Sequence, residues 1–213
     1  FEITTLSAHS NWKKLVEQAV EFTPDNVVIA DKTHYTAVRA GLADHPVKVY
    51  AGSDALEQVV CSEQVDTVVM ALVGYSGLFP TVSALKHGKK VALANKECLV
   101  VAGEIVTRLS AEHRAPIIPV DSEHSAIFQC LTGEHSAVEK VILTASGGPF
   151  LHRPAEELER VSVEEALNHP SWCMGAKVTI DSASLMNKGF EVIEARWLFG
   201  LRPEQIDVVI HPR

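Results

Sequence analysis

Hydrophobic positions over residues 1–121 alternate between two spacings. Short apolar runs predict strands at Glu2–Leu6, Asn26–Ala30, Val47–Tyr50, Thr67–Ala71, Val91–Ala94 and Pro116–Val120. Between these runs, apolar residues recur at helical spacing and predict helices at Asn11–Phe22, Lys32–Leu42, Asp54–Val60, Leu78–His87 and Gly103–His113. Regular alternation of strands and helices predicts an α/β domain, with a mostly parallel sheet covered by helices on both faces.

The pattern changes after residue 121. Val138–Thr144 predicts a strand, Leu185–Phe199 a helix and Ile206–His211 a final strand. The alternation in Lys177–Ile180 also predicts a strand. We therefore expect a second domain of the α+β class over residues 122–213.

Small and polar residues gather where the predicted strands end, at Ser7–Asn11, Ala71–Gly77, Asn95–Glu97 and Asp121–Glu123. In open parallel sheets, ligands bind beyond the carboxyl ends of the strands. No GxGxxG motif follows the first predicted strand, so a dinucleotide-phosphate loop would have to precede residue 1. Because Phe1 opens directly into a strand and the chain stops just after another, we expect both ends to be internal to a longer protein.

Composition narrows the classes of partner. The chain has a formal net charge of −8 and no basic block, so we expect no nucleic-acid partner. An anionic substrate remains compatible with this charge, since a local pocket can be positive on an acidic protein. No apolar run reaches the roughly 18 residues of a membrane span, and we expect no membrane partner. The 4 cysteines form no CxxC pair, which favours free thiols in a reducing compartment.

Two carboxylates flank a serine in the stretch Asp121-Ser122-Glu123, where an apolar run gives way to a helical pattern. One explanation is helix capping, with Asp121 as the cap and Glu123 in the first turn, where acidic side chains favour the helix dipole. The other is a divalent cation, which would need a third ligand from elsewhere. His124 follows the pair and is explained by a place in the first helical turn, so the metal hypothesis does not require it.

A third carboxylate occurs in the predicted helix at Leu185–Phe199. Asn187 and Lys188 precede Glu191 by four and three residues, so all of them share one helix face. Carboxylate oxygens favour a hard ion, Mg²⁺ or Mn²⁺. Ser182 and Ser184 precede this helix, and hydroxyl, amide and ammonium groups there suit a phosphate. The alternative is an ordinary surface ion pair between Lys188 and Glu191.

Two further segments lack helical or strand periodicity. The loop His169–Gly175 carries Trp172, which could cover a site as a lid or could anchor a buried turn. The segment Ser146–Pro149 could bind phosphate through main-chain N–H groups or could be a flexible loop.

Together these stretches resemble the 1-deoxy-D-xylulose 5-phosphate reductoisomerases. The resemblance rests on Leu93–Glu97, Pro119–Phe128, Leu143–Phe150, His169–Gly175 and Val178–Phe199, in that order. It implies a Rossmann-like NADPH-binding domain over residues 1–121 and a connective catalytic domain over residues 122–213. It also implies that a Gly-rich loop precedes the chain and that a helical domain follows it.

The resemblance implies a role for each candidate site residue. The implied ligands of Mg²⁺ or Mn²⁺ are Asp121, Glu123 and Glu191. The implied catalytic residues are Lys96, His169 and Glu191. The implied substrate contacts are Lys96, Ser122, Glu123, Ser146, His169, Trp172, Ser182, Asn187, Lys188 and Glu191. The implied NADPH contacts are Ser10, Asn11, Asn95, Glu97, Met174 and Gly175.

The implied reaction converts 1-deoxy-D-xylulose 5-phosphate to 2-C-methyl-D-erythritol 4-phosphate, for non-mevalonate isoprenoid synthesis. The carbon skeleton rearranges, by cleavage and re-aldol addition or by a ketol shift, and NADPH reduces the resulting aldehyde. We expect the full-length protein to be a homodimer in the cytoplasm or the plastid stroma. Two alternatives stay open: another NADP-dependent, metal-assisted sugar-phosphate oxidoreductase, and a non-catalytic binding fragment.

Overall fold

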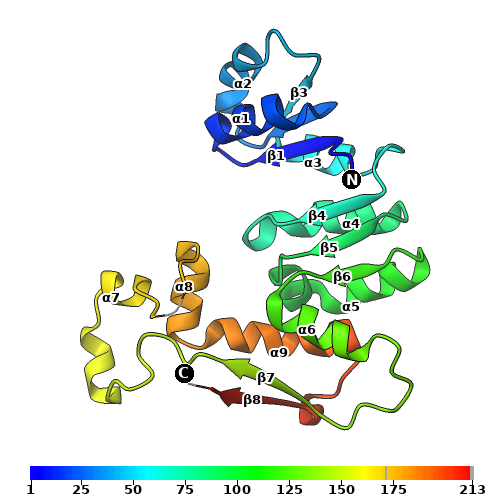
Figure 1. Ribbon diagram of the computed structural model, residues 1–213. Helices are drawn as coiled ribbons and strands as arrows, with labels where there is room; N and C mark the ends of the chain where they lie inside the picture. The colour runs from blue at the N-terminus through cyan, green and yellow to red at the C-terminus, as the bar shows by residue number, and fades with distance from the viewer. Residues whose placement is uncertain (171, 212–213) are drawn as a thin grey trace. The chain divides into compact units, whose positions relative to one another are not determined.

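The computed structural model describes residues 1–170 and 172–211, and these form two compact units (Figure 1). Unit 1 comprises Phe1–Ala92 and Arg108–Ile117. Unit 2 comprises Leu93–Thr107 and the described residues from Ile118 onward. The assignment of cofactor and catalytic domains to residues 1–121 and 122–213 stays a prediction.

Unit 1 contains the expected parallel sheet. Its strands β1 (Thr5–Ala8), β2 (Asn26–Ile29) and β3 (Lys48–Ala51) lie in the order β1-β2-β3, with Leu6 opposite Val27 and Val27 opposite Val49. The helices that follow these strands are α1 (Trp12–Phe22), a short 3-10 turn (Lys32–His34) with α2 (Tyr35–Gly41), and α3 (Ser53–Val59). The first strand begins at Thr5 rather than at the predicted Glu2.

The core of this part of unit 1 is apolar. Leu15 and Ala19 of α1 pack on Val27 and Ile29 of β2, and each is essentially buried. Burial of a large aliphatic side chain contributes about 1.5–3 kcal/mol to folding. The side chain of Asn11 caps α1 by accepting a hydrogen bond of 3.2 Å from the Lys14 N–H. The hydrophobic spacing therefore fixes both the helix and the face that it buries.

A second three-stranded sheet has the order β4-β5-β6, from β4 (Thr67–Met70), β5 (Lys90–Leu93) and β6 (Ile117–Pro119). The 3-10 turn Gly74–Gly77 and α4 (Leu78–Lys86) follow β4, and α5 (Glu97–Glu112) follows β5. Helix α5 begins earlier than the predicted Gly103, because the Asn95 side chain accepts a 2.8 Å hydrogen bond from the Cys98 N–H. A kink at Ala102 interrupts the periodicity on which the prediction depended.

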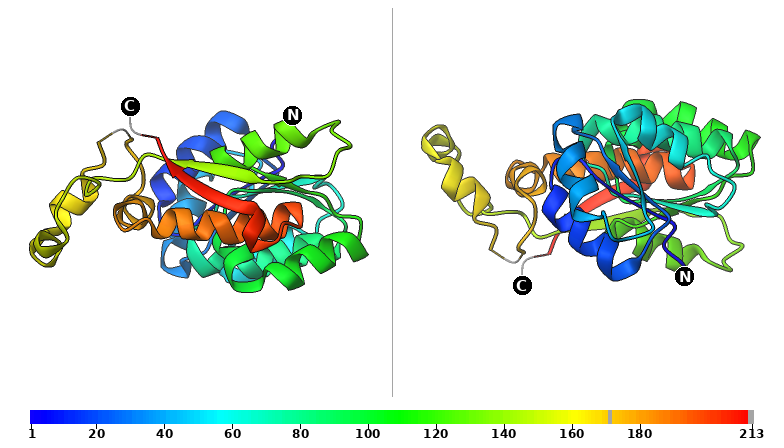
Figure 2. Two further views of the ribbon diagram at one scale, coloured as in Figure 1. Left: turned by 90° about the horizontal axis from the view of Figure 1, so that it is seen from below. Right: turned by 90° about the horizontal axis from the view of Figure 1, so that it is seen from above.

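Unit 2 also contains a parallel strand pair, β7 (Val141–Ala145) and β8 (Ile206–Ile210), with Leu143 opposite Val208. Helix α9 (Met186–Phe199) lies along this pair (Figures 1 and 2). Its Ala195 belongs to the same buried apolar cluster as Leu143. The remaining elements of unit 2 are α6 (Ser122–Leu131), the 3-10 helix Ala155–Arg160, α7 (Val163–Leu167), α8 (Ala176–Ala183) and the 3-10 turn Pro203–Gln205.

The strand predicted at Lys177–Ile180 is wrong, because this segment belongs to helix α8. Four alternating residues also fit a single helical turn, so the pattern does not discriminate. Gly175 begins the helix, and its carbonyl accepts hydrogen bonds from both the N–H and the hydroxyl of Thr179.

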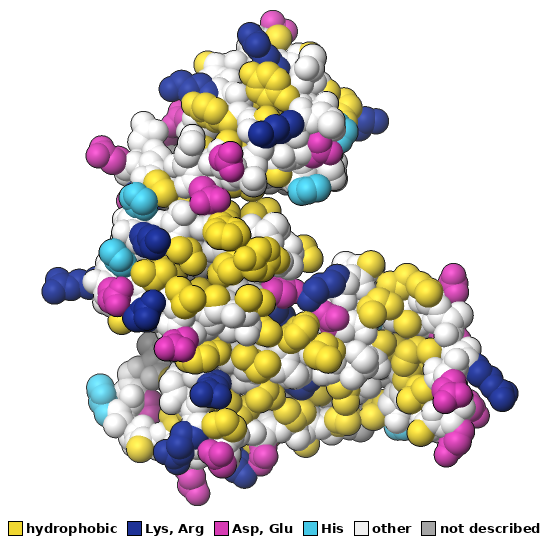
Figure 3. Space-filling view, turned by 180° about the vertical axis from the view of Figure 1, so that it is seen from behind, with side chains coloured by type: hydrophobic (Ala, Val, Ile, Leu, Met, Phe, Trp, Pro, Cys, Tyr) yellow, Lys and Arg dark blue, Asp and Glu magenta, His cyan; other side chains and the backbone are white. Residues whose placement is uncertain are grey.

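Exposed hydrophobic side chains occur in both units, and Figure 3 shows one face on which many of them gather. Among the described helices, none is both long enough and apolar enough to cross a membrane.

Candidate active site

Three carboxylates converge within unit 2. Asp121 is the N-cap of α6, Glu123 lies in the first turn of that helix, and Glu191 comes from α9. One oxygen of each lies within 4.8 Å of an oxygen of the others. The capping explanation is confirmed, since Asp121 Oδ1 accepts a 3.4 Å hydrogen bond from the Glu123 N–H. Capping and ion binding are compatible, because the same turn that caps the helix also aims both side chains at Glu191.

Two lysines enter the same cluster. Lys96 contacts the Asp121 carboxylate and lies 3.3 Å from Glu191 Oε1. Lys188 lies 3.0 Å from Glu123 Oε1, contacts the Glu191 carboxylate and donates to the Thr144 carbonyl at 2.6 Å. The surface-pair explanation for Lys188 and Glu191 is wrong, because these residues are only 7% and 1% exposed.

Burial and charge act on the cluster in opposite directions. Burial alone would raise the pKa of Asp121, but bonding to His124 and the charge of Lys96 outweigh it and hold that pKa well below its ordinary value. Burial raises the pKa of Glu191, and its contacts with Lys188 and Lys96 only partly offset the increase. Burial would lower the pKa of Lys96, yet Asp121 and Glu191 raise it. The carboxylates of the cluster are therefore paired with lysines, and a bound cation would change this balance of charge.

A cavity of about 1380 Å³ opens beside the cluster, within unit 2. All the residues that the sequence suggested as substrate contacts line it: Lys96, Ser122, Glu123, Ser146, His169, Trp172, Ser182, Asn187, Lys188 and Glu191. The structure thus brings together side chains that are up to about a hundred positions apart in the chain.

A glycine turn forms part of the cavity wall. Gly147 and Gly148 have φ values of +90° and +72°, a region that other residues rarely adopt. A Cβ on Gly148 would lie 2.6 Å from the carbonyl oxygen of Ser182, so this turn packs directly on α8. Ser182 therefore lies in the last turn of α8 rather than at the start of α9, as the sequence suggested, but it still lines the cavity.

His169 is held in one orientation within the cavity wall. Its Nδ1 accepts a 3.1 Å hydrogen bond from the Trp172 N–H, so in the neutral ring Nε2 carries the hydrogen and faces Ser146 Oγ at 3.3 Å. Burial lowers the pKa of His169, which favours the neutral ring. Trp172 is 62% exposed, so the alternative of a buried anchor is wrong. Ser171, within the same loop, lies outside the described residues.

The expected cofactor contacts are more dispersed. Met174 lines the cavity, and Gly175 is the N-cap of α8. Asn95 is buried beside Lys96, and Glu97 pairs with Lys177. Ser10 and Asn11 belong to unit 1, where Asn11 begins α1, whereas all residues that line the cavity belong to unit 2.

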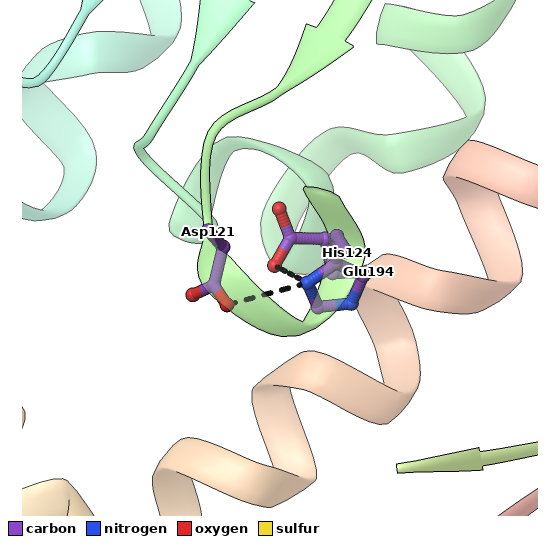
Figure 4. A group of neighbouring side chains, drawn as sticks. All are labelled: Asp121, His124 and Glu194. Carbon is purple, nitrogen blue, oxygen red and sulfur yellow. Dashed lines mark ion pairs between the residues drawn. The ribbon is translucent and has the colours of Figure 1, made fainter. Parts of the chain in front are cut away.

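Sequence reasoning missed one buried pair next to the carboxylates. His124 Nδ1 lies 3.2 Å from Glu194 Oε2 and 3.5 Å from Asp121 Oδ1 (Figure 4). Burial raises the pKa of Glu194 to about 7. Burial would lower the pKa of His124, but bonding to Asp121 and the charge of Glu194 raise it. The sequence feature that could have revealed this pair is its spacing, because His124 and Glu194 each follow a candidate metal ligand by three residues.

Comparisons with known proteins identify the family of the chain. The family model for 1-deoxy-D-xylulose 5-phosphate reductoisomerase matches residues 1–103, and the model for the C-terminal domain of that family matches residues 117–199. The reductoisomerases of Phocaeicola vulgatus and Porphyromonas gingivalis are 58% and 55% identical to the whole chain. The chain spans 56% and 55% of those proteins, about half of their length.

Solved structures of this family are also similar to the chain. A DOX-P reductoisomerase crystallised with NADPH, fosmidomycin and magnesium is 42% identical, with a TM-score of 0.93 over 99% of this chain and 55% of that one. The reductoisomerase of Zymomonas mobilis in complex with NADPH is 40% identical, with a TM-score of 0.90 over 100% of this chain and 55% of that one.

Proposed function

Because the chain belongs to the 1-deoxy-D-xylulose 5-phosphate reductoisomerase family, we propose that the full-length protein converts 1-deoxy-D-xylulose 5-phosphate to 2-C-methyl-D-erythritol 4-phosphate. The reaction would use NADPH and a divalent cation and would serve non-mevalonate isoprenoid synthesis. The observation that carries the proposal is the convergence of Asp121, Glu123 and Glu191 with two buried lysines in one cavity.

The acidic cluster fits a hard cation. Asp121, Glu123 and Glu191 offer only oxygen ligands, which suit Mg²⁺ or Mn²⁺ better than zinc. A divalent ion held there would polarise the substrate carbonyl and acidify a neighbouring hydroxyl. One relative binds magnesium in its crystal structure, and manganese is proposed from ligand chemistry alone.

The other cavity residues suit a keto sugar phosphate. Ser146, Ser182, Asn187 and Lys188 would bind the phosphate and the hydroxyl groups, and the ammonium of Lys188 would offset the phosphate charge. Lys96 and Ser122 would contact the reacting end, close to the carboxylates. His169 would direct its Nε2–H at a substrate oxygen, and Trp172 would cover the bound substrate and exclude water.

NADPH would supply the hydride that reduces the rearranged aldehyde. Two of the solved relatives contain NADPH, which supports this choice. We assign its contacts to Asn95, Glu97, Met174 and Gly175 near the reacting end, and to Ser10 and Asn11 at the adenosine 2′-phosphate.

We also propose that the full-length protein is a homodimer in the cytoplasm, or in the stroma if it comes from a plastid-bearing organism. The bacterial relatives support the first location. The exposed Ile142 and Val209 on the β7–β8 pair support an interface.

An assay of NADPH oxidation by the full-length protein tests the proposal. Turnover should require both 1-deoxy-D-xylulose 5-phosphate and Mg²⁺ or Mn²⁺, and EDTA should abolish it. Oxidation with another keto sugar phosphate, but not with this one, would instead support a different oxidoreductase. Substrate binding that is unaffected by Asp121→Ala, without any turnover, would support a binding protein.

A further inference from the structure

His124 and Glu194 are fully buried beside the candidate metal ligands, yet the proposed reaction gives them no role. His124 follows Asp121 by about one turn at the start of α6, and Glu194 follows Glu191 by about one turn of α9. Neither side chain lines the cavity. They therefore cannot act by contacting a substrate bound there.

Hydrogen-bond donors and acceptors fix the orientation of the imidazole ring. His124 Nε2 lies 2.9 Å from the main-chain carbonyl oxygen of Glu191, which can only accept, so Nε2 carries a hydrogen. The opposite nitrogen faces two carboxylates, with Glu194 at 3.2 Å and Asp121 at 3.5 Å (Figure 4). The plane of the ring is nearly parallel to that of Phe199, at 10° and a centroid distance of 6.3 Å. The ring thus joins both helices that carry the candidate ligands.

We propose that His124 and Glu194 are positioning residues that hold Asp121 and Glu191 in place for the divalent ion. His124 would restrain Asp121 through its carboxylate and Glu191 through its main-chain carbonyl, and Glu194 would hold the ring from its other side. The inference rests on the metal-dependent function proposed above. Outer partners of this kind raise the affinity of a site because they restrict the rotation of its ligands.

One other use of the same residues competes with positioning. Ligand atoms of Asp121, His124 and Glu194 also lie within 4.8 Å of one another, and this set could hold a transition metal. We favour positioning because His124 and Glu194 pair directly at 3.2 Å and neither is exposed to solvent or to the cavity.

Mn²⁺ titration of the full-length protein, followed by the electron paramagnetic resonance signal of free Mn²⁺, tests the proposal without catalysis. Glu194→Gln should weaken Mn²⁺ binding roughly 10–100-fold. His124→Gln retains a donor near the position of Nε2 but loses the contact with Glu194, and it should weaken binding similarly. The double variant should bind no more weakly than His124→Gln alone, because the two side chains act as one unit.

Ala195→Gly is the matched control, since Ala195 is buried on the same helix but packs on the β7–β8 pair. It should lower the thermal midpoint without changing Mn²⁺ affinity. Equal losses of affinity in Ala195→Gly and Glu194→Gln would overturn positioning, as would unchanged affinity in Glu194→Gln. Two bound Mn²⁺ ions, one of them lost in Glu194→Gln, would also overturn it, in favour of a second metal site. A wild-type protein that binds no Mn²⁺ would instead refute the proposed function.

Discussion

The two units differ in the ionisable side chains that they bury. The core around β1, β2 and β3 in unit 1 consists of aliphatic residues such as Leu15, Val27 and Ile29. In the part of the chain that the structure describes, every buried lysine, histidine or carboxylate side chain belongs to unit 2: Lys96, His124, His169, Lys188, Glu191 and Glu194.

This difference indicates that unit 2 is less stable than an apolar core would make it, because it buries ionisable groups around a site. Burying a charge is costly unless it is paired, and a buried pair contributes less stability than an apolar contact of similar volume. Unit 1 incurs little of this cost. Unit 2 buries several ionisable side chains around one cavity, as expected where a functional site is retained at the expense of folding stability. The comparison predicts that mutations of the buried ionisable residues in unit 2 act mainly on ligand binding, whereas core mutations in unit 1 act mainly on folding.

The largest effect should follow the loss of the central carboxylate. Glu191→Gln keeps the shape but removes a negative charge that faces both Lys96 and Lys188. We expect a loss in kcat/KM on the order of 10³-fold, about 4 kcal/mol, because the divalent ion and the lysines lose a common partner. Steady-state NADPH oxidation and Mn²⁺ titration should show the decrease together. Asp207→Asn, the same chemical change at an exposed position of unit 2, is the control and should leave both unchanged.

In unit 1, truncation of a buried core side chain should affect folding alone. Leu15 is 2% exposed in the core of α1 and β2, and Leu15→Ala should lower the free energy of unfolding by about 3 kcal/mol. Chemical denaturation measures this loss. Mn²⁺ affinity under native conditions should remain that of the wild type, since every candidate metal ligand belongs to unit 2. A large loss of affinity would contradict the functional separation of the two units.

The sequence predicted the apolar unit better than the charged one, for a physical reason. Val27, Val28 and Ile29 are fully buried, so a continuous apolar run identifies the strand β2 directly. Helix α8 was mistaken for a strand because four alternating residues fit either period.

Burial of charge has no comparable local signal. Glu194 precedes Ala195 and Arg196 in a helix, a context that is equally typical of an exposed surface. Only the packing of α6 on α9 reveals that Glu194 faces His124. The convergence of Glu191 with Asp121 likewise depends on contacts that are distant in sequence, and the family resemblance supplied it.

The buried pair should make stability depend on pH in a direction opposite to that of an ordinary acidic site. Burial raises the pKa of Glu194 to about 7 in the folded protein, whereas the ordinary value of a glutamate is 4.5. Between these values the folded state holds a proton that the unfolded state has released, so stability falls as pH rises. The raised pKa of His124 acts in the same direction, because its stabilising charge is lost as pH rises through the folded-state value.

We expect Glu194 to account for a loss of about 2 kcal/mol in the free energy of unfolding between pH 5 and pH 7. Denaturation of the wild-type protein and of Glu194→Gln in EDTA, at several pH values, measures the difference. The decline should be shallower in Glu194→Gln, because glutamine does not titrate. Identical pH profiles would show that Glu194 is ionised throughout this range.

The smallest effect should come from an ion pair of the same unit that remains in solvent. Lys140, directly before β7, lies 2.7 Å from the Asp207 carboxylate of β8, but their side chains are 48% and 58% exposed. Water screens such a pair, and ordering two long side chains offsets most of the attraction, so Lys140→Ala should change the free energy of unfolding by only about 0.5 kcal/mol. Denaturation at low and high salt measures the change, which should shrink further as salt is added. Lys188 makes the same kind of contact with Glu191, but these side chains are only 9% and 1% exposed, so Lys188→Ala in the same experiment should have a larger effect that salt leaves nearly unchanged. If salt changed the effects of Lys140→Ala and Lys188→Ala equally, burial would not explain the difference between the cavity charges and the surface charges.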